Sequence, residues 1–178
     1  MKKVIVKTRL ENREDFEADI EDLDLDFSPI VWQHDRVYLP RNYKRGMNYP
    51  RLIMRTEMTS VDSNPMYIMI LKRHIEDSGV DIVDETLVAD YKEAVSIIHQ
   101  LGFTKVNEIS KKRQTVVMDE DTLLLVDSVE GVEGIFAKLE RRIDDKEKVG
   151  EVRKDLVKTF KVFFEKNFIE NAYFEIEK

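Results

Sequence analysis

Lysine and arginine side chains recur inside the segments of this sequence that are predicted to form β-strands. Because clustered cations cannot neutralise one another, several of them converging on one place would require an anion. A polyphosphate suits such a cluster best, since its oxygens accept charge-assisted hydrogen bonds from both Lys and Arg. The strand cations are Lys7, Arg9, Arg51, Arg55, Lys72, Lys111, Arg113 and Lys138.

Two arrangements of the strands would place these cations differently. In a sheet with one solvated face they are simply the outward-facing residues, which is the simpler interpretation. In a sheet closed into a barrel, residues alternate between interior and exterior along every strand, and the interior can enclose a ligand. The sequence leaves both arrangements open. Acidic residues of the same strands are fewer: Glu57, Glu85, Asp127 and Glu140.

The overall composition confines any basic site to a small part of the molecule. The chain of 178 residues is 37% charged and carries a formal net charge of −7, with a pI near 5.2. This balance argues against a general nucleic-acid or membrane-surface binder, which would be basic overall. The hydrophobic content of 42% and the length predict one folded domain over residues 1–178.

Other classes of site lack their characteristic residues. The chain has no cysteine, which excludes disulfides and thiolate chemistry. Its three histidines are not spaced as metal ligands, and the sequence has neither a glycine-rich phosphate loop nor a Gly-x-Ser-x-Gly turn. The first residues do not resemble a signal peptide, and no apolar stretch of about 18 residues occurs, so we expect a cytoplasmic protein.

The clearest predicted elements lie between residues 83 and 140. Apolar residues recur at helical spacing over 91–101, with Asp90 as the N-cap and Gly102 as the stop. In the strand that follows, the odd positions of 105–115 share one face, because side chains in a strand alternate. This face is basic.

The rest of the chain supplies further strands and two more helices. The loop between Pro40 and Pro50 carries Arg41, Lys44 and Arg45 and is interpreted as a solvated connection. Many closely spaced strands with inserted helices predict an α+β protein dominated by antiparallel strands. The C-terminal helix should dock on the body through its aromatic stripe. The other predicted strands are 4–10, 30–39, 51–58, 66–73 and 81–88, and the other helices are 12–23 and 151–169.

The order of these segments resembles that of the CYTH superfamily, which holds class IV adenylate cyclases, thiamine triphosphatases and inorganic triphosphatases. The similarity covers nearly the whole chain up to residue 140. It implies an eight-stranded antiparallel β-barrel, called a tunnel, with flanking helices. Lys and Arg would bind the triphosphate from one side, and glutamates on the other would hold two divalent metal ions. The matching segments are VIVKTRL, QHDRVYL, RLIMRTE, YIMILKR, ETLVAD, LGF, KKR and LLVDSVEGVEGIFAKLE.

The cationic half of the family's site is matched residue by residue. Lys7 matches the lysine that closes the N-terminal Glu-x-Glu-x-Lys motif, and Arg55 and Lys72 match a strand arginine and a strand lysine. Lys111 and Arg113 match the Lys-x-Arg pair. The resemblance therefore implies a nucleoside or inorganic triphosphate as ligand.

The acidic half departs from the family. Lys3 and Ile5 stand where the first motif has two glutamates, Val83 replaces another, and Lys138 replaces one in the closing Glu-x-Glu. Loss of these carboxylates removes most of the oxygen ligands that Mg²⁺ or Mn²⁺ would use. Lys138 is then either a surface lysine or a cation that fills the position of a metal ion.

The surviving acids allow a weaker form of the family's chemistry. Glu85 and Glu140, with Asp127, could hold one Mg²⁺ or Mn²⁺ jointly with a bound phosphate. By resemblance, the catalytic residues would be Lys7, Glu85 and Glu140.

Two functions of different class follow. One is a triphosphatase or adenylate cyclase that acts on ATP, thiamine triphosphate or inorganic triphosphate with a weakened metal site. The other is a phosphate- or nucleotide-binding module that has lost its metal site. The sequence favours binding over catalysis, and it leaves open which triphosphate fits and whether the chain forms a homodimer.

Overall fold

The computed structural model describes residues 2–10, 13–22, 24–44, 49–60, 63–75, 80–144 and 148–163. The helices are α1 (Arg13–Asp22), α2 (Tyr91–Gln100) and α3 (Val149–Phe163). None of these described helices is long and apolar enough to cross a membrane. The strands are β1 (Lys2–Leu10), β2 (Val31–Pro40), β3 (Arg51–Met58), β4 (Met66–Ile75), β5 (Val80–Leu87), β6 (Phe103–Val117), β7 (Thr122–Val129) and β8 (Ile135–Ile143).

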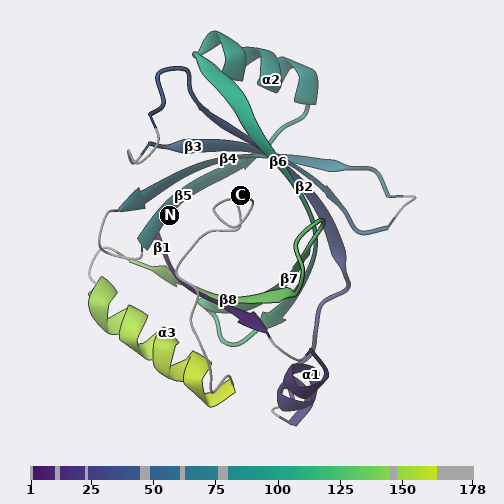
Figure 1. Cartoon of the computed structure of the whole chain (residues 1–178), viewed down its shortest axis with the longest axis vertical. Helices are drawn as coiled ribbons and strands as arrows, with labels where there is room; N and C mark the ends of the chain where they lie inside the picture. Colours follow the sequence, from purple (N-terminus) through teal and green to yellow (C-terminus); the bar gives the residue numbers. More distant parts are fainter. Residues whose placement is uncertain are drawn as a thin grey trace.

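The strands close into a barrel in the order β1-β5-β4-β3-β2-β6-β7-β8. Figure 1 looks into this ring, with α2 above the strands and α1 and α3 below them. All neighbouring strands are antiparallel, and β1 completes the ring by pairing with β5 on one side and β8 on the other. The predicted α+β fold with an eight-stranded antiparallel barrel is therefore confirmed.

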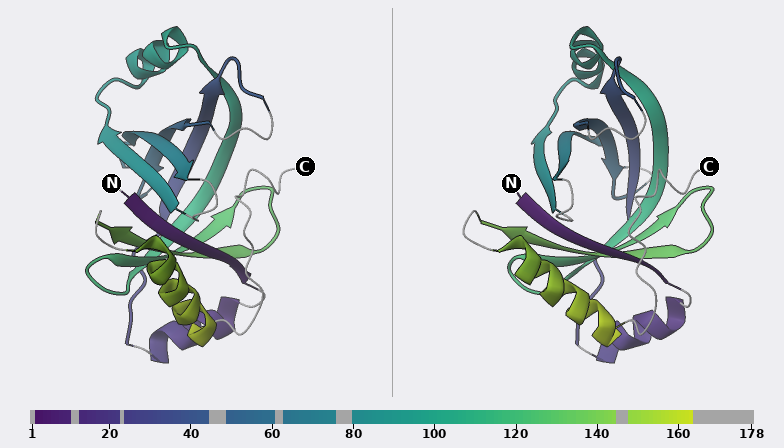
Figure 2. Two further views of the ribbon diagram at one scale, coloured as in Figure 1. Left: turned by 90° about the vertical axis from the view of Figure 1, so that its left-hand side faces the viewer. Right: turned by 60° about the vertical axis from the view of Figure 1, so that its left-hand side comes forward.

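Helices α1 and α3 cover the outer face of the barrel near β1 and β8, as Figure 2 shows from two further sides. Val4 of β1 and Leu139 of β8 are completely buried there, in one apolar cluster with Phe16, Leu156 and Phe160 of the two helices. Alternation along a strand then turns the residues next to Val4 and Leu139 towards the barrel interior. The C-terminal helix docks as its aromatic stripe predicts, although its predicted end at 164–169 lies outside the described residues.

Helix α2 packs on the outer face of β2 and β3. Tyr38, Leu52 and Met54 of the strands are buried against Ala94 and Ile98 of the helix. These strand residues alternate with tunnel-facing ones, so the helix fixes which face of each strand points inward.

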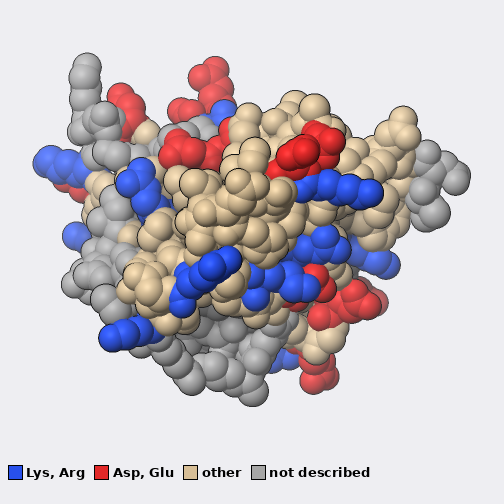
Figure 3. Space-filling model, turned by 90° about the horizontal axis from the view of Figure 1, so that it is seen from above, with Lys and Arg blue, Asp and Glu red and all other residues tan. Residues whose placement is uncertain are grey.

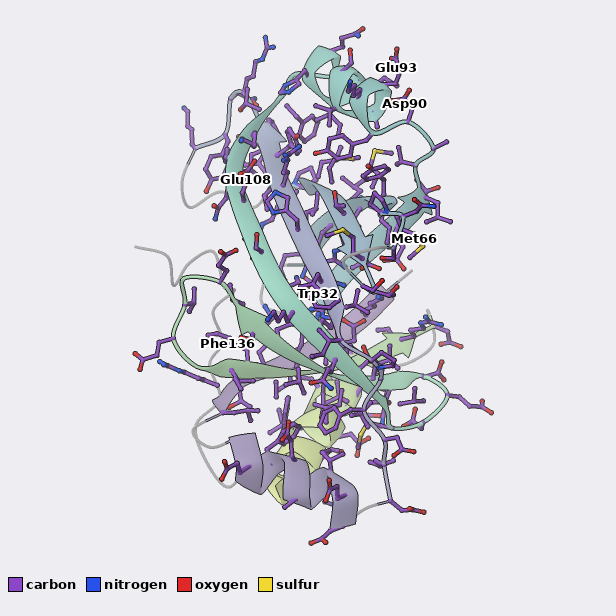
Figure 4. All side chains as sticks on the ribbon, turned by 90° about the vertical axis from the view of Figure 1, so that its right-hand side faces the viewer. Trp32, Met66, Asp90, Glu93, Glu108 and Phe136 are labelled. Carbon is purple, nitrogen blue, oxygen red and sulfur yellow. The ribbon has the colours of Figure 1, made fainter. Side chains whose placement is uncertain are left out.

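Both predicted ends of α2 are observed. The Asp90 carboxylate accepts hydrogen bonds from the backbone N–H groups of Lys92 and Glu93, at 2.9 and 3.0 Å. Figure 4 shows Asp90 and Glu93 together at the start of the helix, above the long strand β6 that carries Glu108. Gly102 has a φ of 86°, a conformation that favours glycine and ends the helix.

One predicted face requires correction. The pairing of β6 with β2 shifts register, so that Val37 faces Asn107 while the next residue, Tyr38, faces Lys105. This bulge turns Lys105 to the outside, where its ammonium donates to Glu108 at 2.7 Å. The basic face of β6 is therefore split at the bulge.

The loop that follows β2 is described only in part. Its Arg41 and Lys44 are exposed, in keeping with a solvated connection. Arg45 lies outside the described residues.

Candidate anion-binding tunnel

The barrel interior, called the tunnel below, encloses a cavity of about 150 Å³. This volume is enough for several water molecules or for a small polyanion. Among the described residues, three carboxylates line it, namely Asp35, Glu85 and Glu140. Eight cations of the described residues line it as well: Lys3, Lys7, Arg51, Arg55, Lys72, Lys111, Arg113 and Lys138.

Like charges lie directly opposite one another in this wall. Lys7 of β1 faces Lys138 of β8, and Arg51 of β3 faces Lys72 of β4. Directly opposed like charges weaken a pair of strands. The barrel thus holds its cations at positions that repel one another and that a bound anion would stabilise.

Asp35 organises one group of cations, which we call the Asp35 cluster (Asp35, Arg55 and Lys111). Arg55 donates to both carboxylate oxygens of Asp35, at 2.6 and 2.9 Å, and the Lys111 ammonium lies 3.0 Å from Oδ2. Burial alone would raise the pKa of Asp35, but Lys111 and Arg55 hold it well below its usual range. Asp35 is therefore ionised. Arg55 also lies 3.6 Å from Glu57 Oε1, so the two cations of this cluster meet two carboxylates.

Glu140 organises a second group, the Glu140 cluster (Glu140, Lys3 and Lys138). The ammonium of Lys3 lies 3.0 Å from Oε1, and that of Lys138 lies 3.0 Å from Oε2. Burial opposes ionisation of Glu140, yet Lys138 and Lys3 keep its pKa far below the usual value. This cluster, unlike the Asp35 cluster, carries one excess positive charge.

Two further acids, Asp81 and Asp127, pair with tunnel cations. Lys72 lies 2.6 Å from Asp81 Oδ2, whose other oxygen is 2.9 Å from His74 Nδ1. Arg113 donates to both oxygens of the fully buried Asp127, at 2.6 and 2.5 Å. These contacts fix the Lys72 and Arg113 side chains at the wall.

Three tunnel lysines titrate far below the ordinary value of 10.5. Burial, together with the charges of Lys72 and Lys138, lowers the pKa of Lys7 to about 7. Burial also lowers the pKa of Lys111 and that of Lys138 to about 8, against the opposing pull of Asp35 and Glu140. An anion in the tunnel would favour the charged form of each of these lysines.

The structure brings most of the predicted site residues together. The predicted catalytic residues Lys7, Glu85 and Glu140 line the tunnel. So do six of the seven strand cations predicted to bind the triphosphate, namely Arg51, Arg55, Lys72, Lys111, Arg113 and Lys138. Arg9 is the exception, because its guanidinium is exposed and lies against Gly134 in the turn after β7, outside the described lining residues. Arg9 alternates in step with Ile5 and Lys7, so it lies on the inward face of β1 but at the exposed end of the barrel.

The predicted metal set, Glu85, Asp127 and Glu140, is not brought together. No three His, Asp or Glu side chains of the described residues are arranged to hold a metal ion. Arg113 occupies both oxygens of Asp127, and Lys3 and Lys138 occupy those of Glu140. The donor set therefore does not fit the divalent ions that the family resemblance implies.

Sequence reasoning missed Asp35 as a site residue. Its signal was a single acid in the otherwise apolar and basic strand β2, two residues from the buried Val37. Its partners lie on β3 and β6, the two neighbours of β2 in the barrel. The sequence identified Lys3 only as a residue that stands in the place of a family glutamate. In the structure its ammonium donates to Glu140.

The exposed surface differs from the tunnel in its balance of charge. Figure 3 views the molecule from the side that carries α2, and there Lys and Arg side chains lie among Asp and Glu side chains. Because the whole chain is acidic, the excess of cations in the tunnel is a local feature.

Comparison with known proteins supports the fold. No protein-family model matches the chain, and no curated protein does. The PH1819 protein of Pyrococcus horikoshii superposes with a TM-score of 0.84 at 17% identity, over 98% of this chain and 97% of that one. A candidate adenylate cyclase from Vibrio parahaemolyticus gives 0.79 at 18% identity, with the same coverage of 98% and 97%.

A third structure has the same fold. A candidate adenylyl cyclase from Hippeastrum with a dominant triphosphatase activity gives a TM-score of 0.64 at 16% identity, over 99% of this chain and 94% of that one. Identities this low establish the fold alone. The fold shared with these structures is the closed eight-stranded antiparallel barrel that the resemblance predicted.

Proposed function

We propose that this chain, which has the triphosphate tunnel fold, binds a triphosphate-type anion inside its barrel. The observation that carries the proposal is the lining of the tunnel, where eight cations face three carboxylates. Convergent Lys and Arg groups in a partly desolvated site favour a ligand with several negative charges over one with a single charge.

The distribution of the cations favours a chain of phosphates. The cations come from β1, β3, β4, β6 and β8 and so surround the cavity on several sides. Arg55 and Arg113 are fixed by bidentate contacts to Asp35 and Asp127, so they lose little side-chain freedom when they bind. The triphosphatase activity of the Hippeastrum neighbour supports the same class of ligand.

The proposal is tested by titrating tripolyphosphate, ATP and thiamine triphosphate into the protein in a calorimeter, with orthophosphate as the single-phosphate control. We expect at least one triphosphate to bind, and orthophosphate to bind far more weakly. The affinity should fall as NaCl is raised, because salt screens the contacts between the cations and the phosphates.

Single substitutions distinguish triphosphate binding in the tunnel from binding at the outer surface. Lys7→Met and Arg51→Met each remove a tunnel cation and should weaken triphosphate binding. Lys112→Met, on the exposed side of β6, should leave it unchanged. Absence of both heat and a melting shift at millimolar triphosphate would contradict the proposal.

Catalysis has weaker support than binding. Glu140 is held by two ammonium groups, and Glu85 makes no ion pair with another described residue that would orient it as a base. The proposed role of the tunnel cations is to bind and orient phosphates, and no three His, Asp or Glu side chains of the described residues are placed to hold a metal ion. We therefore expect phosphate release from tripolyphosphate and cyclisation of ATP, assayed with and without Mn²⁺, to be absent or far below those of an intact tunnel enzyme.

A further inference from the structure

The acids of the tunnel hold cations in the places where a metal-binding tunnel would need free oxygen ligands. Both oxygens of Glu140 contact ammonium groups, those of Lys3 and Lys138, at 3.0 Å. Both oxygens of Asp35 accept hydrogen bonds from Arg55, and one also accepts from Lys111. These two lining carboxylates are thus positioning groups for lysine and arginine.

The neighbouring wall positions offer no replacement ligands. Ile5 lies directly opposite Glu140, and Val83 lies directly opposite Lys72. Both side chains line the tunnel, and neither has an oxygen. Glu85 is left as the lining acid without an ion pair among the described residues, and one carboxylate is a poor site for Mg²⁺, which binds through several oxygens.

We propose that the tunnel recognises the metal-free form of its polyphosphate ligand, with Lys3 and Lys138 supplying the positive charge that divalent ions would otherwise bring. This inference rests on the proposed function and specifies the state of the ligand. A Mg²⁺ ion carried in by the ligand would lie among ammonium groups with few oxygens to receive it, and it would mask the phosphate charge that the cations contact.

The decisive experiment compares the affinity of the unaltered protein for tripolyphosphate in EDTA and in excess Mg²⁺. Ionic strength is matched with NaCl, so that screening is equal in the two arms. We expect the affinity in Mg²⁺ to be lower by about tenfold or more, which corresponds to about 1.4 kcal/mol. Tighter binding in Mg²⁺ would overturn the inference and leave the proposed function standing. If no binding occurs in either arm, both fail.

A variant series tests the role of the two lysines. Lys138→Gln keeps a polar side chain that is one atom shorter and removes the charge, and it should weaken metal-free binding by roughly tenfold, as expected for one charge-assisted contact. Lys3→Gln should act in the same direction, which guards against a folding defect in either variant. Lys112→Gln is the matched control on the exposed side of β6 and should have no effect.

The series has a clear contrary result. If Lys3→Gln and Lys138→Gln are both folded, as judged by thermal melting, and both bind as tightly as the unaltered protein, then these ammonium groups do not contact the phosphates. The inference is then wrong.

Discussion

Asp35 and Glu140 show how single residues give this tunnel its charge pattern. Each carboxylate lies between two cations and keeps both at hydrogen-bonding distance. Because Glu57 also contacts Arg55, the unmatched positive charge lies in the Glu140 cluster. A buried carboxylate with one cation would be neutral and would attract no anion. With two cations it fixes their positions and still leaves charge for a ligand.

Removal of the Asp35 charge should therefore destabilise the protein. In Asp35→Asn, the cations of Arg55 and Lys111 lose their common partner, and we expect a loss of about 3–5 kcal/mol in the free energy of unfolding, measured with urea. Tripolyphosphate should reduce this loss, because its charge replaces that of the carboxylate.

The matched control is Glu108→Gln. Glu108 also contacts two cations, Arg36 and Lys105, but on the exposed outer face of the barrel. Surface ion pairs contribute little, so this variant should be nearly as stable as the unaltered protein. Equal losses for both variants would show that the position of Asp35 in the tunnel is irrelevant.

The low pKa of Lys7 predicts that the protein takes up protons when it binds an anion in the tunnel. Lys7 faces Lys138 on β8, Lys72 on β4 and Arg51 on β3, with Asp81 on β5 as the opposing charge, and its pKa is about 7. An anion favours the ammonium form and so raises this pKa in the complex. Above pH 7 the free protein must gain a proton on binding, and its affinity should fall as the pH rises through 7–9.

Calorimetry in buffers of different ionisation enthalpy measures this uptake. The phosphates titrate in the same range, so the quantity to compare is the difference between the unaltered protein and Lys7→Met. We expect a smaller uptake in the variant. The same uptake in both proteins would place the proton on the ligand or on another lysine.

The sequence predicts which residues face the tunnel better than it predicts their partners. Alternation along β3 and β4 is enough to place Arg51, Arg55 and Lys72 on one face. The contact of Asp35 with Lys111 depends on the pairing of β2 with β6, which are far apart in the chain. Nothing local in the sequence signals that pairing.

At the scale of elements, β6 shows where a regular pattern stops being predictive. A strict period of two would put Lys105 on the face of Lys111, but the bulge opposite Tyr38 reverses the residues on one side of it. The bulge lies next to α2, where the strand leaves the helix and enters the barrel. One extra residue at this point decides how far the cationic lining extends.

Helix α2 was predictable because its signals are local. The N-cap Asp90 is followed by an amphipathic run and a glycine stop, and each acts within a few residues. Asp90→Ala removes two hydrogen bonds to backbone N–H groups and should lower the free energy of unfolding by about 1 kcal/mol in urea denaturation.

Asp90→Ser is the control, since a serine can cap the same groups. It should lose much less stability than Asp90→Ala. Because α2 packs outside the barrel, both variants should bind tripolyphosphate with unchanged affinity. A weaker affinity in Asp90→Ala alone would mean that the helix, and not only the strands, shapes the tunnel.

At the scale of the whole molecule, closure of the barrel turns scattered residues into a site. The cations of β1 and β8 meet those of β3 and β6 only because β1 pairs with both β5 and β8. The same closure brings Lys3, Ile5, Val83 and Lys138 into one wall. These are the positions where the family resemblance implies glutamates. The four replacements therefore change the same part of the tunnel wall.

A combined variant should therefore convert the tunnel from a metal-independent site into a metal-dependent one. Its four substitutions are Lys3→Glu, Ile5→Glu, Val83→Glu and Lys138→Glu. Removing two ammonium groups frees both oxygens of Glu140, and the new carboxylates supply the ligands that Mn²⁺ prefers. We expect Mn²⁺ to raise the melting temperature of this variant but not that of the unaltered protein. We also expect Mn²⁺-dependent phosphate release from tripolyphosphate to appear or increase.

The corresponding four glutamine substitutions are the control, since they add polar groups of the same size without charge. They should bring neither metal-dependent stability nor metal-dependent activity. Robust Mn²⁺-dependent turnover by the unaltered protein, abolished by Glu85→Gln or Glu140→Gln, would be the opposite result. It would mean that Glu140 exchanges its ammonium partners for a metal ion once a phosphate chain is bound, and that the surviving carboxylates suffice for catalysis.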